Sequence, residues 1–292
     1  MLCAQYMLCG TLYVMRFRMR KRNVIALSMF ALFYVALGAA LTLNQERMIY
    51  HPFPQDFDAC TELRDAERVT AGGTRMYMRS GERGLVVLYH GNAGSACDRA
   101  FYADMFVEDG YGYVLPEYTG YSNDSKTPTH EALKANVRDV VAYLQTVQST
   151  STLVVGESIG TGLASYHASL AAPDRLFLIS PFTSLRALAQ RKFWYYPARV
   201  MVDNAYDNVA TLQTYAGQVM IMHGEDDAIV PHAQGAALFA ALPERGDHMF
   251  ITVQGAGHND LFRSWDAFMA IDHFLGGALG REFFVHNPPQ YR

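Results

Sequence analysis

Residues 152–172 read TLVVGESIGTGLASYHASLAA. The β-branched, apolar start of this stretch is typical of a buried strand, and its end, rich in alanine and leucine, favours a helix. Between the two lies a Gly-x-Ser-x-Gly pattern at residues 156–160. A sharp turn from strand to helix requires Gly156 and Gly160, because a Cβ at either position would meet a neighbouring strand or helix. Ser158 is therefore a candidate nucleophile, and an ordinary turn of small residues is the alternative.

Short apolar runs of the same kind recur along the chain. They are Leu85–Tyr89, Tyr111–Pro116, Leu176–Ile179, Val219–Met222 and Met249–Val253. These runs lack polar alternation, which predicts strands buried on both faces of a parallel sheet. Apolar residues at helical spacing occupy 133–144 and 261–275, and a hairpin is expected around residues 71–73. Strands that alternate with helices predict a doubly wound α/β sheet.

A serine nucleophile needs a base to take its proton and a carboxylate to fix the tautomer of that base. In an open α/β sheet these groups belong in loops that follow later strands. His258 follows the strand at 249–253 in a glycine-rich loop, and we expect Asn259 or Asp260 to cap the next helix. Three carboxylates follow the strand at 219–222, and spacing alone does not choose among Glu225, Asp226 and Asp227.

The same chemistry needs two backbone N–H groups to stabilise an oxyanion. Ile159, directly after the candidate nucleophile, is expected to supply one. The loop after the strand at 85–89 begins His90-Gly91-Asn92 and is expected to supply the other, with Asn92 as donor. Gly91 allows the backbone to approach a substrate there. His90 ends a strand, so we expect it to orient the loop rather than to act as a second base.

Residues 24–43 carry no charge and are long enough, at 1.5 Å per residue, to cross a hydrocarbon core of about 30 Å. Basic residues precede this run at positions 16, 18 and 20–22, so the positive-inside rule predicts a cytoplasmic N-terminus and an extracytoplasmic domain, periplasmic or lumenal. A cleaved signal peptide, with small residues at 36–38 or 38–40, and a buried core helix are the alternatives.

The sequence therefore predicts a basic leader at 1–23, a signal anchor at 24–43, a globular domain at 44–280 and a tail at 281–292. Residues 1–14 match no element, and Met15 is an alternative start. The chain has a formal charge of −4, and without the basic cluster the remainder carries 19 Lys and Arg against 28 Asp and Glu. So acidic a domain does not favour nucleic acid as a partner.

Cysteine positions fit an exported domain. Cys60 and Cys97 lie after the apolar run, where an oxidising compartment would allow them to pair, and two unpaired thiols are the alternative. Cys3 and Cys9 lie in the leader. No ligand spacing typical of a structural metal site occurs in the sequence, and neither a metal nor a cofactor is expected.

Six segments together resemble the Bem46-like branch of the α/β hydrolases, which includes α/β-hydrolase domain-containing proteins 12, 13 and 17. They are HGNAG at 90–94, PEYTGYS at 116–122, GESIG at 156–160, SPFTS at 180–184, HGEDDAIVP at 223–231 and GAGHND at 255–260. The resemblance covers residues 49–275. It implies a mostly parallel, doubly wound α/β-hydrolase fold with a small cap insertion at about 185–212, preceded by one transmembrane helix.

The resemblance also implies roles for single residues. In this branch the acid stands four residues before a proline, which here selects Asp227 before Pro231 and completes a triad with Ser158 and His258. One departure is visible, because Glu117-Tyr118-Thr119-Gly120-Tyr121-Ser122 stands where relatives often have Asp-Tyr-Arg-Gly-Tyr-Gly. The expected activity is hydrolysis of a small-molecule ester, thioester or lipid by a serine esterase. A serine aminopeptidase and a non-catalytic binding scaffold are the alternatives, and the aromatic residues 193–196 either line an acyl pocket or cover the sheet.

Overall fold

The computed structural model describes residues 21–203, 206–286 and 289–291, and it divides into two units at Leu43 and Asn44. The first unit contains α1 (Lys21–Leu43), which is long and apolar enough to cross a membrane. Gly38 is its only buried residue, so the interpretation as a core helix is wrong. Residues 1–14, with Cys3 and Cys9, lie outside the described residues.

The second unit, called here the hydrolase unit, is built on a nine-stranded sheet in the order β11-β10-β9-β8-β7-β4-β6-β3-β2. The strands are β2 (Glu67–Ala71), β3 (Thr74–Arg79), β4 (Leu85–Tyr89), β6 (Gly112–Glu117), β7 (Thr152–Glu157), β8 (Arg175–Ile179), β9 (Gln218–Gly224), β10 (Met249–Val253) and β11 (Gln290–Tyr291). Pairing is parallel from β6 to β10 and antiparallel at both edges. A separate parallel pair joins β1 (His51–Pro52) to β5 (Ala93–Gly94).

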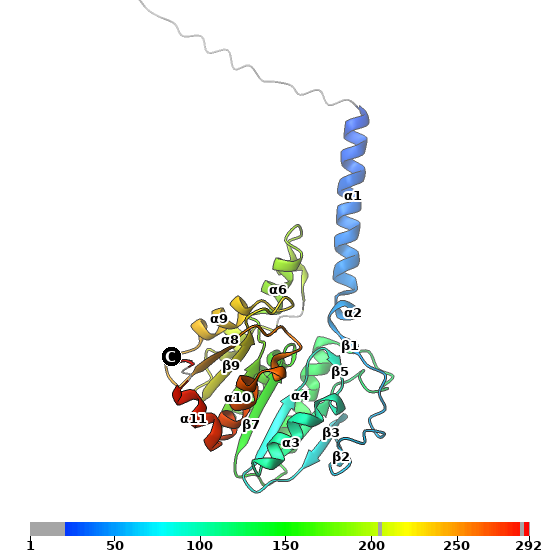
Figure 1. Ribbon diagram of the computed structural model, residues 1–292. Helices are drawn as coiled ribbons and strands as arrows, with labels where there is room; N and C mark the ends of the chain where they lie inside the picture. The colour runs from blue at the N-terminus through cyan, green and yellow to red at the C-terminus, as the bar shows by residue number, and fades with distance from the viewer. Residues whose placement is uncertain (1–20, 204–205, 287–288, 292) are drawn as a thin grey trace, which may run out of the picture. The chain divides into compact units, whose positions relative to one another are not determined.

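Helices cover both faces of this sheet (Figure 1). The described helices of the unit are α2 (Gln45–Ile49), α3 (Ala100–Glu108), α4 (His130–Leu144), α5 (Gly160–Leu170), α6 (Leu185–Lys192), α7 (Ala198–Met201), α8 (Asn208–Leu212), α9 (His232–Ala241), α10 (Trp265–Leu275) and α11 (Ala278–His286), with short 3-10 turns η1 (Cys97–Arg99) and η2 (Leu261–Arg263). Side chains of β4 alternate between two apolar cores. Val86 and Leu88 pack with α3 and α10, whereas Val87 and Tyr89 pack with α4 and α5.

The six predicted strands all form, since their apolar side chains fill both cores. Two local expectations differ from the structure. The helix after His258 is capped by Ser264, whose hydroxyl accepts the Asp266 N–H at 3.2 Å, because Asp260 instead accepts the Gly257 N–H. In addition, α11 and β11 occupy the region expected to be a tail, where β11 pairs with β10. Three short helices, α6, α7 and α8, lie in the insertion at 185–212.

Candidate active site

The turn between β7 and α5 holds Ser158 in a left-handed conformation, with φ 52°. Its backbone N–H donates to the Ile179 carbonyl at 2.9 Å, which ties the turn to the neighbouring strand β8. A Cβ on Gly160 would collide with the Tyr89 carbonyl oxygen, and one on Gly156 would lie 2.6 Å from the Gly160 carbonyl oxygen. The two glycines therefore allow β4, β7 and α5 to come close enough for the turn to form.

Ser158, His258 and Asp227 lie in one hydrogen-bonded line. The Ser158 hydroxyl is 2.9 Å from Nε2 of His258, and Nδ1 of the same ring is 2.7 Å from Oδ2 of Asp227. A carboxylate only accepts hydrogen bonds, so Nδ1 carries the proton and Nε2 is left as the acceptor for the hydroxyl. The structure thus brings together three residues that are 100 and 31 positions apart in the chain.

Burial distinguishes the three candidate carboxylates. Asp227 is buried, whereas Glu225 and Asp226 are exposed. Besides His258, Asp227 accepts the Ile229 N–H at 2.9 Å and the Val230 N–H at 2.8 Å. Burial opposes ionisation of Asp227, but hydrogen bonds from histidine rings and from Val230 outweigh it and hold the pKa of this carboxyl below its usual range. Asp227 is therefore an anion at neutral pH.

His223 also belongs to this site, although the sequence analysis missed it. This fully buried residue of β9 has its Nε2 2.8 Å from the Val230 carbonyl oxygen and 3.3 Å from Oδ2 of Asp227. It therefore holds the loop that carries Asp227. A polar residue at the end of an apolar strand was the available signal, since such a residue needs a buried partner.

The segments that carry the two predicted oxyanion donors both lie next to Ser158. Ile159 begins the turn into α5, and the loop with Gly91 passes so close that a Cβ on Gly91 would lie 3.7 Å from the Ser158 Cβ. Asn92 is fixed by its side chain, which donates to the Ile49 carbonyl at 2.9 Å, and by its own carbonyl, which accepts the His51 N–H at 3.0 Å and the Tyr121 hydroxyl at 2.8 Å. The parallel pairing of β1 with β5 then joins His51 and Pro52 to the next two residues of the loop, Ala93 and Gly94.

The His90 side chain packs against its own loop and the segment that follows β6. Its ring stacks on Tyr118 at 3.9 Å, its Nδ1 is 2.8 Å from the Gly91 carbonyl oxygen, and its Nε2 is 3.3 Å from buried Glu117. Glu117 also accepts the Ala96 N–H at 3.1 Å and the Ser122 hydroxyl at 2.7 Å. Two of the three residues that depart from the resemblance, Glu117 and Ser122, therefore bond to each other, and Glu117 also supports the loop that carries Asn92.

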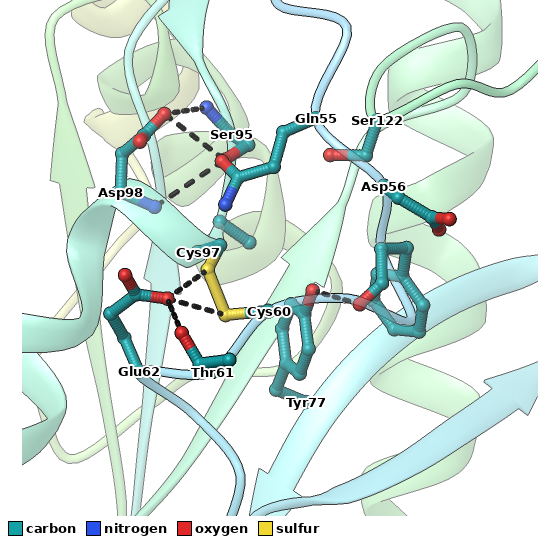
Figure 2. Close-up of a disulfide and its surroundings, with 12 residues drawn as sticks. Gln55, Asp56, Cys60, Thr61, Glu62, Tyr77, Ser95, Cys97, Asp98 and Ser122 are labelled. Carbon is teal, nitrogen blue, oxygen red and sulfur yellow. Dashed lines mark hydrogen bonds between the residues drawn. A yellow bond between two sulfur atoms is a disulfide. The ribbon is translucent and has the colours of Figure 1, made fainter.

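The turn η1 connects this loop to two other segments. Cys97 forms a disulfide bond with Cys60, and Asp98 accepts the Ser95 N–H at 2.8 Å (Figure 2). Arg99 makes a bidentate ion pair with Glu157, the residue before Ser158, with both N–O distances 2.7 Å. Glu62 lies beside the disulfide, and within the described residues this is the one cluster of possible metal ligands. Both of its sulfurs are used by the disulfide.

A doubly wound sheet with a serine, a histidine and a carboxylate at its carboxyl edge defines the α/β-hydrolase class of enzyme. The model of the prolyl oligopeptidase family matches residues 99–281, and the chain belongs to that family of α/β hydrolases. The chain is 30% identical over 243 residues to an uncharacterized protein of Mycobacterium tuberculosis, covering 77% of this chain and 85% of that protein. It is 28% identical to α/β-hydrolase domain-containing protein 17B of Homo sapiens over 59% of each chain.

Solved structures share the fold. Est1E from Butyrivibrio proteoclasticus, determined with bound ferulic acid, superposes with a TM-score of 0.59 at 17% identity, covering 72% of this chain and 98% of that one. A putative non-heme bromoperoxidase of Mycobacterium tuberculosis gives a TM-score of 0.55 at 17% identity, covering 72% and 97%. The predicted fold class and the resemblance to the branch that contains protein 17 are confirmed.

Proposed function

We propose that the protein is a membrane-anchored serine hydrolase that cleaves carboxylic esters or thioesters through an acyl-enzyme. The hydrogen-bonded line from Ser158 through His258 to Asp227 carries this proposal.

In the proposed reaction, Nε2 of His258 takes the hydroxyl proton while Oγ of Ser158 attacks the substrate carbonyl carbon. The N–H groups of Ile159 and Asn92 stabilise the resulting oxyanion. As the intermediate collapses, the imidazolium gives its proton to the leaving alcohol or thiol. Water then attacks the acyl group by the same route, which releases the acid and restores Ser158.

Replacement of the nucleophile tests this mechanism. Ser158→Ala removes the attacking oxygen, so we expect it to abolish labelling by a fluorophosphonate probe and turnover of p-nitrophenyl esters, with little change in the thermal midpoint. Ser165→Ala is a matched control, because Ser165 lies buried on the same helix α5 away from the turn and should keep its labelling. Labelling that persists in Ser158→Ala would falsify the assignment.

A peptidase is the second candidate, because the matching family model is that of prolyl oligopeptidases. The same triad cleaves esters and amides, so the residues near Ser158 do not choose between them. A comparison of kcat/KM for p-nitrophenyl esters of graded chain length and for aminoacyl anilides separates the two. We expect the esters to be the better substrates. A preference for the anilides would assign the protein to the peptidases.

The membrane part of the proposal rests on α1 and on the basic residues that precede it. A signal anchor at 24–43 would keep the N-terminus in the cytoplasm and export the hydrolase unit from residue 44 onward. The Cys60–Cys97 disulfide supports an oxidising compartment. A reporter that is active only outside the cytoplasm, fused after Arg292, should be active. N-terminal sequencing of the mature protein distinguishes an anchor from a cleaved signal peptide.

A further inference from the structure

The segment 193–202, called here the cap tip, exposes apolar side chains. It connects α6 to α7 and continues through α7 in the insertion that follows β8. Trp194 is 78% exposed, Tyr195 50% and Val200 82%, whereas the neighbouring Tyr196 is buried. The aromatic residues therefore neither line an acyl pocket as a group nor simply cover the sheet. Large apolar side chains that gather on a surface indicate an interaction site.

Four cations lie within or next to the cap tip in the sequence. Arg186, Arg191, Lys192 and Arg199 lie on α6 and α7, and within the described residues none of the four forms an ion pair. This concentration of positive charge contrasts with the hydrolase unit as a whole, in which Asp and Glu outnumber Lys and Arg by nine. Arg186 and Arg199 also line a groove of about 490 Å³, to which Asp207 contributes a single carboxylate. Such a surface is complementary to an anionic partner.

Hydrogen bonds connect this surface to the residues that follow α1. The Gln45 side chain donates to Oδ2 of Asp203 at 3.1 Å and accepts the Asp203 N–H at 3.0 Å. Gln45 stands two residues after Leu43, the last residue of α1. If α1 crosses a bilayer, Gln45 lies close to the bilayer surface because it is two residues from the end of the helix. Its hydrogen bonds then keep Asp203, the residue after the cap tip, close to that surface as well.

We propose that the cap tip docks onto an anionic lipid surface, with Trp194, Tyr195 and Val200 in the headgroup region and the four cations against lipid phosphates. Exposed aromatic rings next to Arg and Lys are the composition that the membrane interface favours. This inference rests on the proposed membrane anchor. Since β8 ends at the same sheet edge as Ser158, a docked insertion turns the active site toward acyl lipids of the bilayer as its substrate class.

Tryptophan fluorescence tests the docking directly, because Trp194 and Trp265 are the only two tryptophans in the chain. Trp265→Phe leaves Trp194 as the sole reporter in the full-length protein, reconstituted in nanodiscs of phosphatidylcholine and phosphatidylglycerol. We expect brominated lipids to quench Trp194 emission about twofold or more, because an interfacial residue lies in reach of the acyl chains. Trp194→Phe is the matched control, with Trp265 at the start of α10 as the reporter, and should show weaker quenching.

The outcomes separate the two proposals. Protein that is lost from nanodiscs in high salt would mean that the membrane anchor fails. Protein that stays in the discs with unquenched Trp194, or with Trp194 and Trp265 quenched equally, would overturn the docking of the cap tip alone. Trp194 that is shielded from aqueous acrylamide but not quenched by brominated lipid would indicate a protein partner and would also overturn it.

The charge component has its own variant. Arg191→Glu with Lys192→Glu reverses two exposed cations that make no described ion pair. Quenching of Trp194 in this variant should fall most in discs that contain phosphatidylglycerol, while turnover of a soluble p-nitrophenyl ester stays unchanged. Quenching that is independent of lipid charge in both the parent and the variant would overturn the anionic surface as the partner.

Discussion

Among the residues that the structure describes, four other than glycine have left-handed backbone angles, and Ser158 is one of them. Ser180, at the end of β8, and Ser122 and Asn123, in the loop after β6, are the others, and all four follow strands of the parallel sheet at its carboxyl edge. Such conformations cost about 1–3 kcal/mol each and persist only where surrounding contacts fix them. At Ser158 the N–H bond to Ile179 and the close packing of Gly160 supply those contacts. The strain therefore coincides with the proposed site of chemistry.

The choice of acid is testable at single residues. Asp227→Asn offers His258 an amide that can donate to Nδ1, which shifts the ring proton to Nε2 and removes the acceptor for the Ser158 hydroxyl. We expect kcat for an ester to fall by roughly 10³–10⁴. Asp226→Asn is the matched control, because Asp226 is adjacent but exposed, and its effect should be less than about tenfold. A larger loss in Asp226→Asn than in Asp227→Asn would contradict the assignment.

Much of this site could be predicted from local sequence. Ser158 and His258 follow from glycine-rich turns after apolar strands, and Asn92 follows from the loop after β4. Asp227 needed the family resemblance, since three adjacent carboxylates have the same chemistry and only burial separates them. His223 and Glu117 were not predicted as site residues. Their partners lie on other segments, and a buried pair such as His90 with Glu117 leaves no periodic pattern in the sequence.

At the scale of elements, η1 is the point where several segments meet the nucleophile turn. Within three residues it holds the disulfide to Cys60, the Asp98 bond to the oxyanion loop and the Arg99 pair with Glu157. Burial alone would lower the pKa of Arg99, but the Glu157 carboxylate raises it, so the guanidinium is charged at neutral pH. The segment that follows α2 is thereby fastened to the turn that carries Ser158 through one short element.

Loss of the disulfide should affect stability and activity together. The bond closes a loop with a sequence separation of 37, for which restriction of the unfolded chain contributes about 3–4 kcal/mol. We expect reduction to lower the thermal midpoint, and ester turnover to decline at temperatures below the new midpoint, because the oxyanion loop loosens first. Circular dichroism melts and turnover with and without a phosphine reductant measure both effects.

The double variant Cys60→Ala, Cys97→Ala is the control for this experiment. It should resemble the reduced protein and should show no further response to the reductant. Mass spectrometry of non-reduced peptides from the membrane fraction should recover Cys60 and Cys97 in one linked species. Recovery of both as freely alkylated thiols would contradict the bridge in the native protein.

Element boundaries show what sequence patterns miss. The six parallel strands were predictable because each carries three or more consecutive apolar residues. In contrast, β11 has two residues and forms by pairing with Met249 and Phe250 of β10, and α11 begins only two residues after the glycine that ends α10. Short elements of this kind depend on partners distant in sequence, so their own composition does not predict them.

At the scale of the whole molecule, β4 contributes side chains to both cores, and α5 packs into one of them. His167 of α5 is buried in this region, and its Nδ1 is 2.8 Å from the Tyr89 hydroxyl at the end of β4. Burial lowers the pKa of His167 to about 4. The ring is therefore neutral in the folded protein at pH 7, and the bond to Tyr89 joins the nucleophile helix to the strand that leads into the oxyanion loop.

This shift makes stability depend on pH in a defined window. An unfolded chain protonates His167 near pH 6.5, whereas the folded protein resists protonation until about pH 4. Between these values the unfolded state binds more protons, so the free energy of unfolding decreases as the pH falls. A difference of this size corresponds to about 3 kcal/mol for a buried group, lost progressively from pH 6.5 to pH 4.

His167→Gln removes this titration and should flatten the pH dependence of unfolding. Other histidines with lowered pKa values, His130, His232 and His273, contribute to the slope of the parent protein, so the comparison between parent and variant isolates His167. His286→Gln, at an exposed position of α11, is the matched control and should keep the parental slope.

The measurement is the free energy of unfolding of the full-length protein in denaturant at several pH values from 4 to 7. The variant should lose stability at pH 7, where its bond to Tyr89 is weakened, but should lose less than the parent on acidification. A variant with the parental slope would show that His167 is solvated or protonated in the native protein, contrary to the buried pair with Tyr89.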